Sequence, residues 1–378
     1  LEARDRLGGR VHTLNDVPGR PEGGGPVISE SYERLLRIAA AVGAEMGPGP
    51  GFEPQLLLHV NGLNVTGEQW AASAANGLAG PEKQLLPPLL LGYYTSQDLP
   101  LSGFEDWISP SHANIDIPLD EYLRQRGASD EAIRLINVAP NTNEIATTSA
   151  LWALRNAQRR RDSKGGRIVA AVGGNSVLID KMAGAIRGSI LTGHPVTAVR
   201  SLDDRVEIEC EDGSVHDGEF CVMTLPLSVL RGVQITPALQ GLQKEGVEQI
   251  PYTAITKYFI VPREPFWEQD GLPPSMWTDT IIERLFPIRD AEGRVQNITC
   301  WVDGANAQTL DALPEEEQKA RVLEELARIR PATTDKVEVA KIVSWGRDPW
   351  AKGAYAHYAP GQVTRLKPVV AAPWQRIH

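Results

Sequence analysis

The sequence predicts a mixed fold of helices and strands, α/β or α+β, arranged in two domains. The chain has 378 residues, enough for two domains at roughly 100–200 residues each. Hydrophobic residues make up 42% and charged residues 23%, which is typical of a globular protein rather than a disordered or fibrous one. A block of helical periodicity at 119–161 lies between regions with strand patterns. Helices inserted between sheet regions favour a mixed fold with discontinuous domains.

The first expected helix covers residues 29–42. Its apolar residues recur at helical spacing, with Ser29 as the predicted N-cap and Gly43 as the stop. Residues 44–118 are rich in glycine and proline, so we expect irregular structure with short helices there. Asn61-Gly62 is typical of a hairpin turn.

From residue 119 onward, helical and strand periodicities alternate along the chain. Short apolar runs separated by the turn pairs Asp203-Asp204 and Asp212-Gly213 indicate a small antiparallel meander. The expected helices are residues 119–126, 130–138, 148–161, 178–186 and 315–329, and the expected strands are residues 196–199, 206–210, 220–225, 255–261 and 298–302.

Composition excludes several classes of function. The formal net charge of −10 argues against nucleic acid or an anionic membrane surface as the main partner. The most apolar stretch, residues 85–94, is broken by Pro87, Pro88 and Gly92 and is far shorter than the ~20 residues of a membrane span. The three cysteines and seven histidines form no metal-ligand pattern, disulfide framework or hydrolase triad. We therefore expect no metal site and no hydrolase.

The opening residues carry the first chemical signal. Glu2 follows an apolar residue at the end of an expected strand, where a carboxylate can accept hydrogen bonds from a nucleotide ribose. Gly8 and Gly9 precede Arg10. Glycines permit close backbone approach, and a guanidinium can pair with phosphate oxygens in a bidentate geometry.

Residues 1–13, LEARDRLGGRVHT, resemble the segment after the second strand of FAD-dependent amine oxidases. This family includes monoamine oxidases, polyamine oxidases and L-amino acid oxidases. The resemblance implies a Rossmann-like FAD-binding domain with an inserted substrate domain. It also implies that Glu2 holds the adenosine ribose, that Gly8, Gly9 and Arg10 lie against the diphosphate, and that Arg4 belongs to the same cofactor-binding set.

Further glycine segments follow the order of the family. Residues 22–28, EGGGPVI, resemble its next element, which implies that Gly24 and Gly25 pass close to the flavin. The pair Gly173-Gly174 is similar to the one that returns the chain to the cofactor domain. By the same resemblance, Val196 meets the adenine through its backbone.

Two later segments imply the catalytic residues. Residues 255–267 place Lys257 within an apolar strand and resemble the segment whose lysine holds a water at the flavin N5 edge. Residues 345–361 resemble the family segment beside the flavin. There the resemblance makes Tyr355 one wall of an aromatic cage for the amine and places Trp345 beside the isoalloxazine. Ala354 stands where mitochondrial enzymes have the cysteine that binds flavin, so FAD is expected to be non-covalent.

The resemblance implies an activity and a domain division. We expect oxidation of a primary or secondary amine or an amino acid, with hydride transfer from the α-carbon to flavin N5. Imine hydrolysis and reoxidation by O2 to H2O2 would follow. The FAD-binding domain is expected at residues 1–48, 163–228 and 342–378, and the substrate domain at residues 49–162 and 229–341.

Three alternatives remain at this stage. An L-amino acid oxidase would require a cation for the substrate carboxylate, and the sequence does not indicate which arginine serves. A carotenoid-desaturase-like FAD dehydrogenase would not consume oxygen. The resemblance begins after the family's first strand and Gly-x-Gly-x-x-Gly turn and stops before its terminal FAD-covering segment, so we expect a fragment of a longer protein. The third alternative is therefore a non-catalytic chain unable to hold FAD. The compartment and the oligomeric state stay undetermined, with the cytoplasm favoured.

Overall fold

The protein is described from a computed structural model, which covers residues 1–51, 53, 55–163 and 166–378. Short 3-10 helices connect many of the elements below. The α-helices are α1 (Glu33–Ala41), α2 (Leu90–Ser96), α3 (Leu119–Gln125), α4 (Asp130–Val138), α5 (Ala150–Asp162), α6 (Ser176–Ala185), α7 (Leu227–Leu230), α8 (Gly241–Gln249), α9 (Phe266–Asp270), α10 (Gly304–Asp311), α11 (Glu315–Ile329) and α12 (Val363–Val370). The strands are β1 (Ile28–Ser29), β2 (Met46–Pro48), β3 (Leu57–Val60), β4 (Leu63–Thr66), β5 (Ile168–Ala171), β6 (Val196–Ser201), β7 (Val206–Cys210), β8 (Val215–Gly218), β9 (Gln234–Thr236), β10 (Ile255–Pro262), β11 (Met276–Thr278), β12 (Arg284–Arg289), β13 (Val295–Asp303) and β14 (Val337–Ser344).

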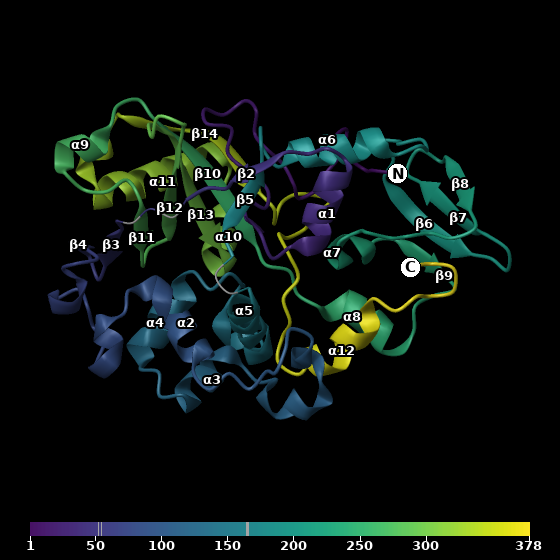
Figure 1. The fold of residues 1–378 in the computed structure, drawn as a ribbon, viewed down its shortest axis with the longest axis horizontal. Helices are drawn as coiled ribbons and strands as arrows, with labels where there is room; N and C mark the ends of the chain where they lie inside the picture. Colours follow the sequence, from purple (N-terminus) through teal and green to yellow (C-terminus); the bar gives the residue numbers. More distant parts are fainter. Residues whose placement is uncertain (52, 54, 164–165) are drawn as a thin grey trace.

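The strands form three sheets. The largest has the order β14-β10-β13-β12-β11-β3-β4, with β10 antiparallel to both of its neighbours. A smaller sheet has the order β8-β7-β6-β9, and the third has the order β1-β5-β2. Figure 1 shows the meander β6–β8 at one end of the molecule, on the same side as both chain termini.

The seven-stranded sheet separates two hydrophobic cores. On one face, Tyr258 and Val302 pack against Leu326 of α11. On the other, Leu58 and Trp277 join the core formed by the helical block α2–α5, which lies beneath the sheet in Figure 1. Because successive side chains of a strand point to opposite faces, both faces of this sheet are covered.

The structure confirms most of the expected elements. The turn at Asn61-Gly62 joins β3 to β4, with positive φ at both residues. Helices α4 and α11 have the predicted bounds. The first helix is an exception, because α1 begins at Glu33 and its N-cap is Tyr32. The predicted cap Ser29 pairs with β5 instead, so the chain is extended at the position where the apolar spacing predicted a helix.

The prediction for the third strand of the meander is wrong. The sequence predicts a strand at 220–225, whereas the structure places β8 at Val215–Gly218, paired with β7. Cys221 makes only an isolated parallel bridge with Ile377. Residues 215–218 include few apolar side chains, because the outer face of this edge strand is exposed. They therefore lack the apolar pattern from which a strand is predicted.

The described part of the chain contains neither a membrane-spanning helix nor a metal-binding cluster. Among these residues, none of the helices combines the length and the apolar character that a bilayer crossing requires. The same residues include no cluster of three or more histidine, cysteine or acidic side chains arranged to hold a metal ion.

Candidate active site

A cavity of about 600 Å³ lies where the glycine-rich N-terminal loops meet strands β10 and β13. Its volume is within the roughly 300–1,000 Å³ of small-molecule and cofactor sites. Side chains and backbone from widely separated parts of the sequence line it. The structure brings together in this one cavity all the site residues that the sequence analysis named: Glu2, Arg4, Gly8, Gly9, Arg10, Gly24, Gly25, Val196, Lys257, Trp345 and Tyr355.

Close backbone approaches require two of the four glycines in these loops. A Cβ added to Gly24 would lie 2.0 Å from the carbonyl oxygen of Arg10, so no larger residue fits there. Gly8 has a φ of +94°, and a Cβ there would lie 2.8 Å from the carbonyl oxygen of Val11. At Gly9 and Gly25 a Cβ would meet nothing within 4 Å. The loops therefore present bare backbone to the cavity.

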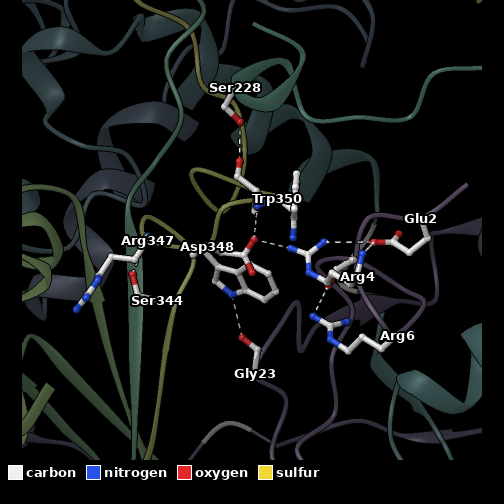
Figure 2. Close-up of polar contacts among 12 residues, drawn as sticks. Glu2, Arg4, Arg6, Gly23, Ser228, Ser344, Arg347, Asp348 and Trp350 are labelled. Atoms are coloured by element: carbon white, nitrogen blue, oxygen red, sulfur yellow. Dashed lines mark hydrogen bonds and ion pairs between the residues drawn. The ribbon is translucent and has the colours of Figure 1, made fainter. Parts of the chain in front are cut away.

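Charged side chains fix the first loop. Figure 2 shows the Arg4 guanidinium between the carboxylates of Glu2 and Asp348. Arg4 Nη2 lies 2.5 Å from Asp348 Oδ1, and the Arg4 backbone N–H donates to Glu2 Oε1 at 2.8 Å. The backbone of Glu2 also bonds with Leu191 and His194 at the entrance to β6. These contacts hold the Glu2 carboxylate at the cavity wall.

Arg10 reaches across the cavity. Its Nη1 donates to the carbonyl oxygen of Ala354, which joins the N-terminal loop to the segment that carries Tyr355. Burial lowers the pKa of the Arg10 guanidinium below its usual range, although an arginine remains protonated at neutral pH. The cavity thus has a cation beside the bare backbone of Gly8 and Gly9.

Lys257 is placed by the alternation of β10. Its neighbour Tyr258 points toward α11, where its hydroxyl donates to Gln318 Oε1 at 2.9 Å, so Lys257 points to the opposite face and into the cavity. Lys257 Nζ donates to the carbonyl oxygens of Gly24 at 2.6 Å and Glu22 at 3.1 Å. Burial lowers the pKa of Lys257 to about 7, against the opposing attraction of the Glu22 and Asp303 carboxylates.

Glu22 supports the loop beneath Lys257. Its Oε1 accepts hydrogen bonds from the Asn175 backbone N–H at 2.7 Å and from Thr13 Oγ1 at 2.8 Å. Asn175 immediately precedes α6, so the carboxylate lies at the positive end of that helix. Burial nevertheless raises the pKa of Glu22. The carboxylate ties the glycine loop to the Gly173-Gly174 segment that the resemblance singled out.

Two aromatic residues come from the last predicted segment. The Trp345 indole Nε1–H donates to the carbonyl oxygen of Gly23 at 3.0 Å, in a buried position. The Tyr355 hydroxyl donates to the carbonyl oxygen of Asn141 at 3.0 Å. Burial raises the pKa of Tyr355 above its usual range, so its hydroxyl stays protonated. Each side chain is therefore held by a hydrogen bond to the backbone of a different loop.

Sequence reasoning missed the residues around Trp301, which also lines the cavity. Trp301 lies opposite both Lys257 on β10 and Arg284 on β12. Its indole Nε1–H donates to Asp303 Oδ1 at 2.7 Å, and Asp303 Oδ2 lies 2.6 Å from Arg284 Nη2. No local motif marks these positions, because they meet only through the pairing of three strands.

Known proteins resemble this chain over half or all of its length. The flavin containing amine oxidoreductase profile matches residues 1–378. The flavin-dependent L-tryptophan oxidase RebO of Lentzea aerocolonigenes is 30% identical over 203 residues, which span 51% of this chain and 42% of that protein. A flavin-containing amine oxidase of Oncorhynchus mykiss is 22% identical over 411 residues, covering 100% of this chain and 75% of that protein.

A solved structure shows the same fold. A triple mutant of putrescine oxidase matches with a TM-score of 0.80 at 18% identity, over 100% of this chain and 86% of that one. This chain therefore shares its arrangement of three sheets and inserted helices with that oxidase. Given the profile match over the whole chain, this protein belongs to the flavin-containing amine oxidoreductase family.

Proposed function

We propose that this protein binds FAD non-covalently in the cavity and oxidises a primary or secondary amine. The observation that carries the proposal is the meeting, in one cavity, of a carboxylate at Glu2, an exposed-backbone glycine loop with Arg10, and a buried lysine flanked by aromatic residues. These are the groups that a dinucleotide at one end and an amine at the other require. We keep the predicted two-domain division as part of this proposal, with β14 assigned wholly to the substrate domain because both of its ends pair with β10.

The residues present fit FAD. The bare backbone at Gly9 and Gly25 leaves room for close contact, and Arg10 offers charged donors for a phosphate. Glu2 offers a carboxylate for ribose hydroxyls. Ala354 has no side-chain nucleophile. The proposal therefore predicts that denaturing the protein releases all of the bound flavin.

The chemistry divides between cofactor and chain. When bound, the flavin would accept a hydride equivalent from the substrate α-carbon and pass both electrons to O2, which yields H2O2, while water hydrolyses the imine product. Lys257 supplies a buried amine that holds a water molecule or exchanges a proton at Nζ. Tyr355 supplies an aromatic face that orients a neutral amine, and Trp345 closes the wall and keeps bulk water out.

An amino acid is the second candidate substrate. The support is the name of the relative that is 30% identical, an L-tryptophan oxidase, whereas the relative matched over the whole chain is named an amine oxidase. The two candidates differ in the carboxylate of the substrate. A comparison of each amino acid with the amine that lacks its carboxylate separates them.

The test begins with flavin binding. The protein is incubated with FAD, freed of excess cofactor and examined for visible flavin absorbance, then precipitated with acid. The proposal expects flavin on the folded protein and all of it in the acid supernatant. A panel of amines and matched amino acids is next scored for oxygen consumption and H2O2. Flavin that binds but never transfers electrons to oxygen would favour a dehydrogenase, and a protein that takes up no flavin would overturn the proposal.

A further inference from the structure

Trp301 and Lys257 occupy paired positions on the two central strands of the large sheet. Lys257 on β10 lies opposite Trp301 on β13, and Trp301 lies opposite Arg284 on β12. Residues directly opposite in an antiparallel pair project to the same face. The three side chains therefore form one row, and both Lys257 and Trp301 line the cavity.

The amine of Lys257 contacts the indole. Lys257 Nζ lies 4.2 Å from the centroid of the Trp301 ring, within the roughly 6 Å of a cation–π interaction. Two of its three possible hydrogen bonds go to the carbonyl oxygens of Gly24 and Glu22. A buried ammonium group loses its hydration. The ring and the two carbonyl dipoles replace part of that lost stabilisation for Lys257.

The indole itself is held in place. Its Nε1–H donates to Asp303 Oδ1 at 2.7 Å. Asp303 is 1% exposed, and its other oxygen accepts from Arg284 Nη2 at 2.6 Å and from the Asn141 backbone N–H at 3.0 Å. This carboxylate has little freedom to move, so the ring next to Lys257 is fixed. Hydrogen bonding of the indole N–H to a carboxylate also makes its ring more electron-rich.

We infer that Trp301 is a positioning residue for Lys257. The indole ring of Trp301 holds the Lys257 amine at the cavity wall and stabilises its ammonium form. The role of Lys257 in oxidation rests on the proposed function, whereas the contact with Trp301 does not.

The groups around Lys257 determine its pKa, and therefore the direction in which that pKa should change when the Trp301 indole is removed. Glu22 from the glycine loop and Asp303 from β13 favour the ammonium form, whereas Arg284 from β12 and burial oppose it. The pKa of Lys257 is about 7 as a result. Removing the indole takes away one favourable contact, so the ammonium should lose its proton at lower pH.

The test measures the protonation of Lys257 directly. The protein is treated briefly with acetic anhydride over a range of pH, and acetylation of Lys257 is quantified by peptide mass spectrometry. Only the neutral amine reacts. For Trp301→Leu we expect the midpoint of reactivity to fall by about one pH unit, or about tenfold in the ratio of amine to ammonium. Trp301→Phe keeps an aromatic face and should shift the midpoint less.

Trp267→Leu is the matched control, because Trp267 is also half-buried but lies on α9, away from the cavity. Its midpoint should equal that of the unchanged protein. The inference is overturned if Trp301→Leu and Trp301→Phe leave the midpoint unchanged or raise it, if Trp267→Leu lowers it equally, or if Lys257 resists acetylation at every pH. Because the readout needs no turnover, a shifted midpoint without flavin-dependent activity would sustain this inference and refute the proposed function.

Discussion

Lys257 Nζ lies 2.6 Å from the carbonyl oxygen of Gly24. This contact joins a central strand of the large sheet to the glycine loop near the N-terminus, two segments 233 residues apart. The lysine thus links the two sides of the cavity, and the loop cannot shift without affecting the amine. The position of the amine and the shape of the cofactor-facing loop are consequently parts of one arrangement.

Replacement of Lys257 by Met should reduce turnover while FAD remains bound. The change removes the amine that holds water or a proton in the cavity, and groups of this kind contribute at least about a hundredfold to rate. Oxygen consumption with the best amine measures the loss. Lys341→Met is the control, because Lys341 lies on the adjacent strand β14 and pairs with Asp16. Equal losses in both variants would contradict a specific role for Lys257.

Glu2→Gln should weaken FAD binding about tenfold, because a charged acceptor contributes roughly 1.5 kcal/mol more than a neutral one to such hydrogen bonds. Titration with FAD, followed by flavin fluorescence, gives the dissociation constant. Asp5→Asn changes the charge equally at an exposed position of the same loop and should leave the constant unchanged. A similar weakening in both would point to the net charge of the loop rather than to a contact of Glu2.

Gly24→Ala should destabilise the protein and reduce FAD uptake, because its Cβ would lie 2.0 Å from the Arg10 carbonyl oxygen and force the backbone apart. The expected loss is at least 1–3 kcal/mol of unfolding free energy. Gly25→Ala tests the same substitution where a Cβ meets nothing within 4 Å, and its stability should change by less than about 0.5 kcal/mol. Denaturant unfolding of both variants measures the difference, and equal stabilities would refute the close packing of this loop.

Stability should depend on pH through Lys257. Burial lowers the pKa of Lys257 from its ordinary 10.5 to about 7. Between these values the unfolded chain binds more protons than the folded one, so this group makes stability rise with pH, by up to about 1.4 kcal/mol per unit. Unfolding measured from pH 7 to 9 should therefore show a smaller rise in Lys257→Met than in the unchanged protein. The same slope in both proteins would mean that Lys257 is not buried as a poorly solvated cation.

Tyr355→Phe should retain most of the activity, because the ring remains and only the hydrogen bond to the Asn141 carbonyl is lost. A loss of roughly 1 kcal/mol in stability is expected for such a bond. Tyr355→Ala removes the aromatic face and should raise KM for the amine more than it lowers kcat. Steady-state kinetics of the two variants separate the ring from the hydroxyl, and equal kinetic losses would show that the hydroxyl matters.

The sequence predicted the local parts of this molecule well. Helices α4 and α11 and the turn at Asn61-Gly62 follow from periodicity and turn chemistry, which are properties of neighbouring residues. The site residues named from the sequence followed from the family resemblance, and the cavity brings them together. Glu2 and Lys257, for example, lie far apart in the sequence and line the same cavity.

The features that the sequence did not predict depend on pairings between distant segments. Trp301 faces Lys257 only because β10 and β13 pair in one register, and Asp303 holds Arg284 only because β12 lies next to β13. The start of α1 at Glu33 rather than Ser29 has the same cause, since β1 is drawn into a sheet by β5. At the start of α1, tertiary pairing overrode local propensity.

The most direct test of the central claim is anaerobic mixing of the FAD-loaded protein with an amine, followed by admission of air. The account predicts that visible flavin absorbance is lost with the amine, returns with oxygen and is accompanied by one H2O2 per amine oxidised. Lys257→Met should slow this cycle, whereas Lys341→Met should not. A protein that holds FAD yet shows no change in absorbance with any amine or amino acid of the panel would contradict the proposed oxidation.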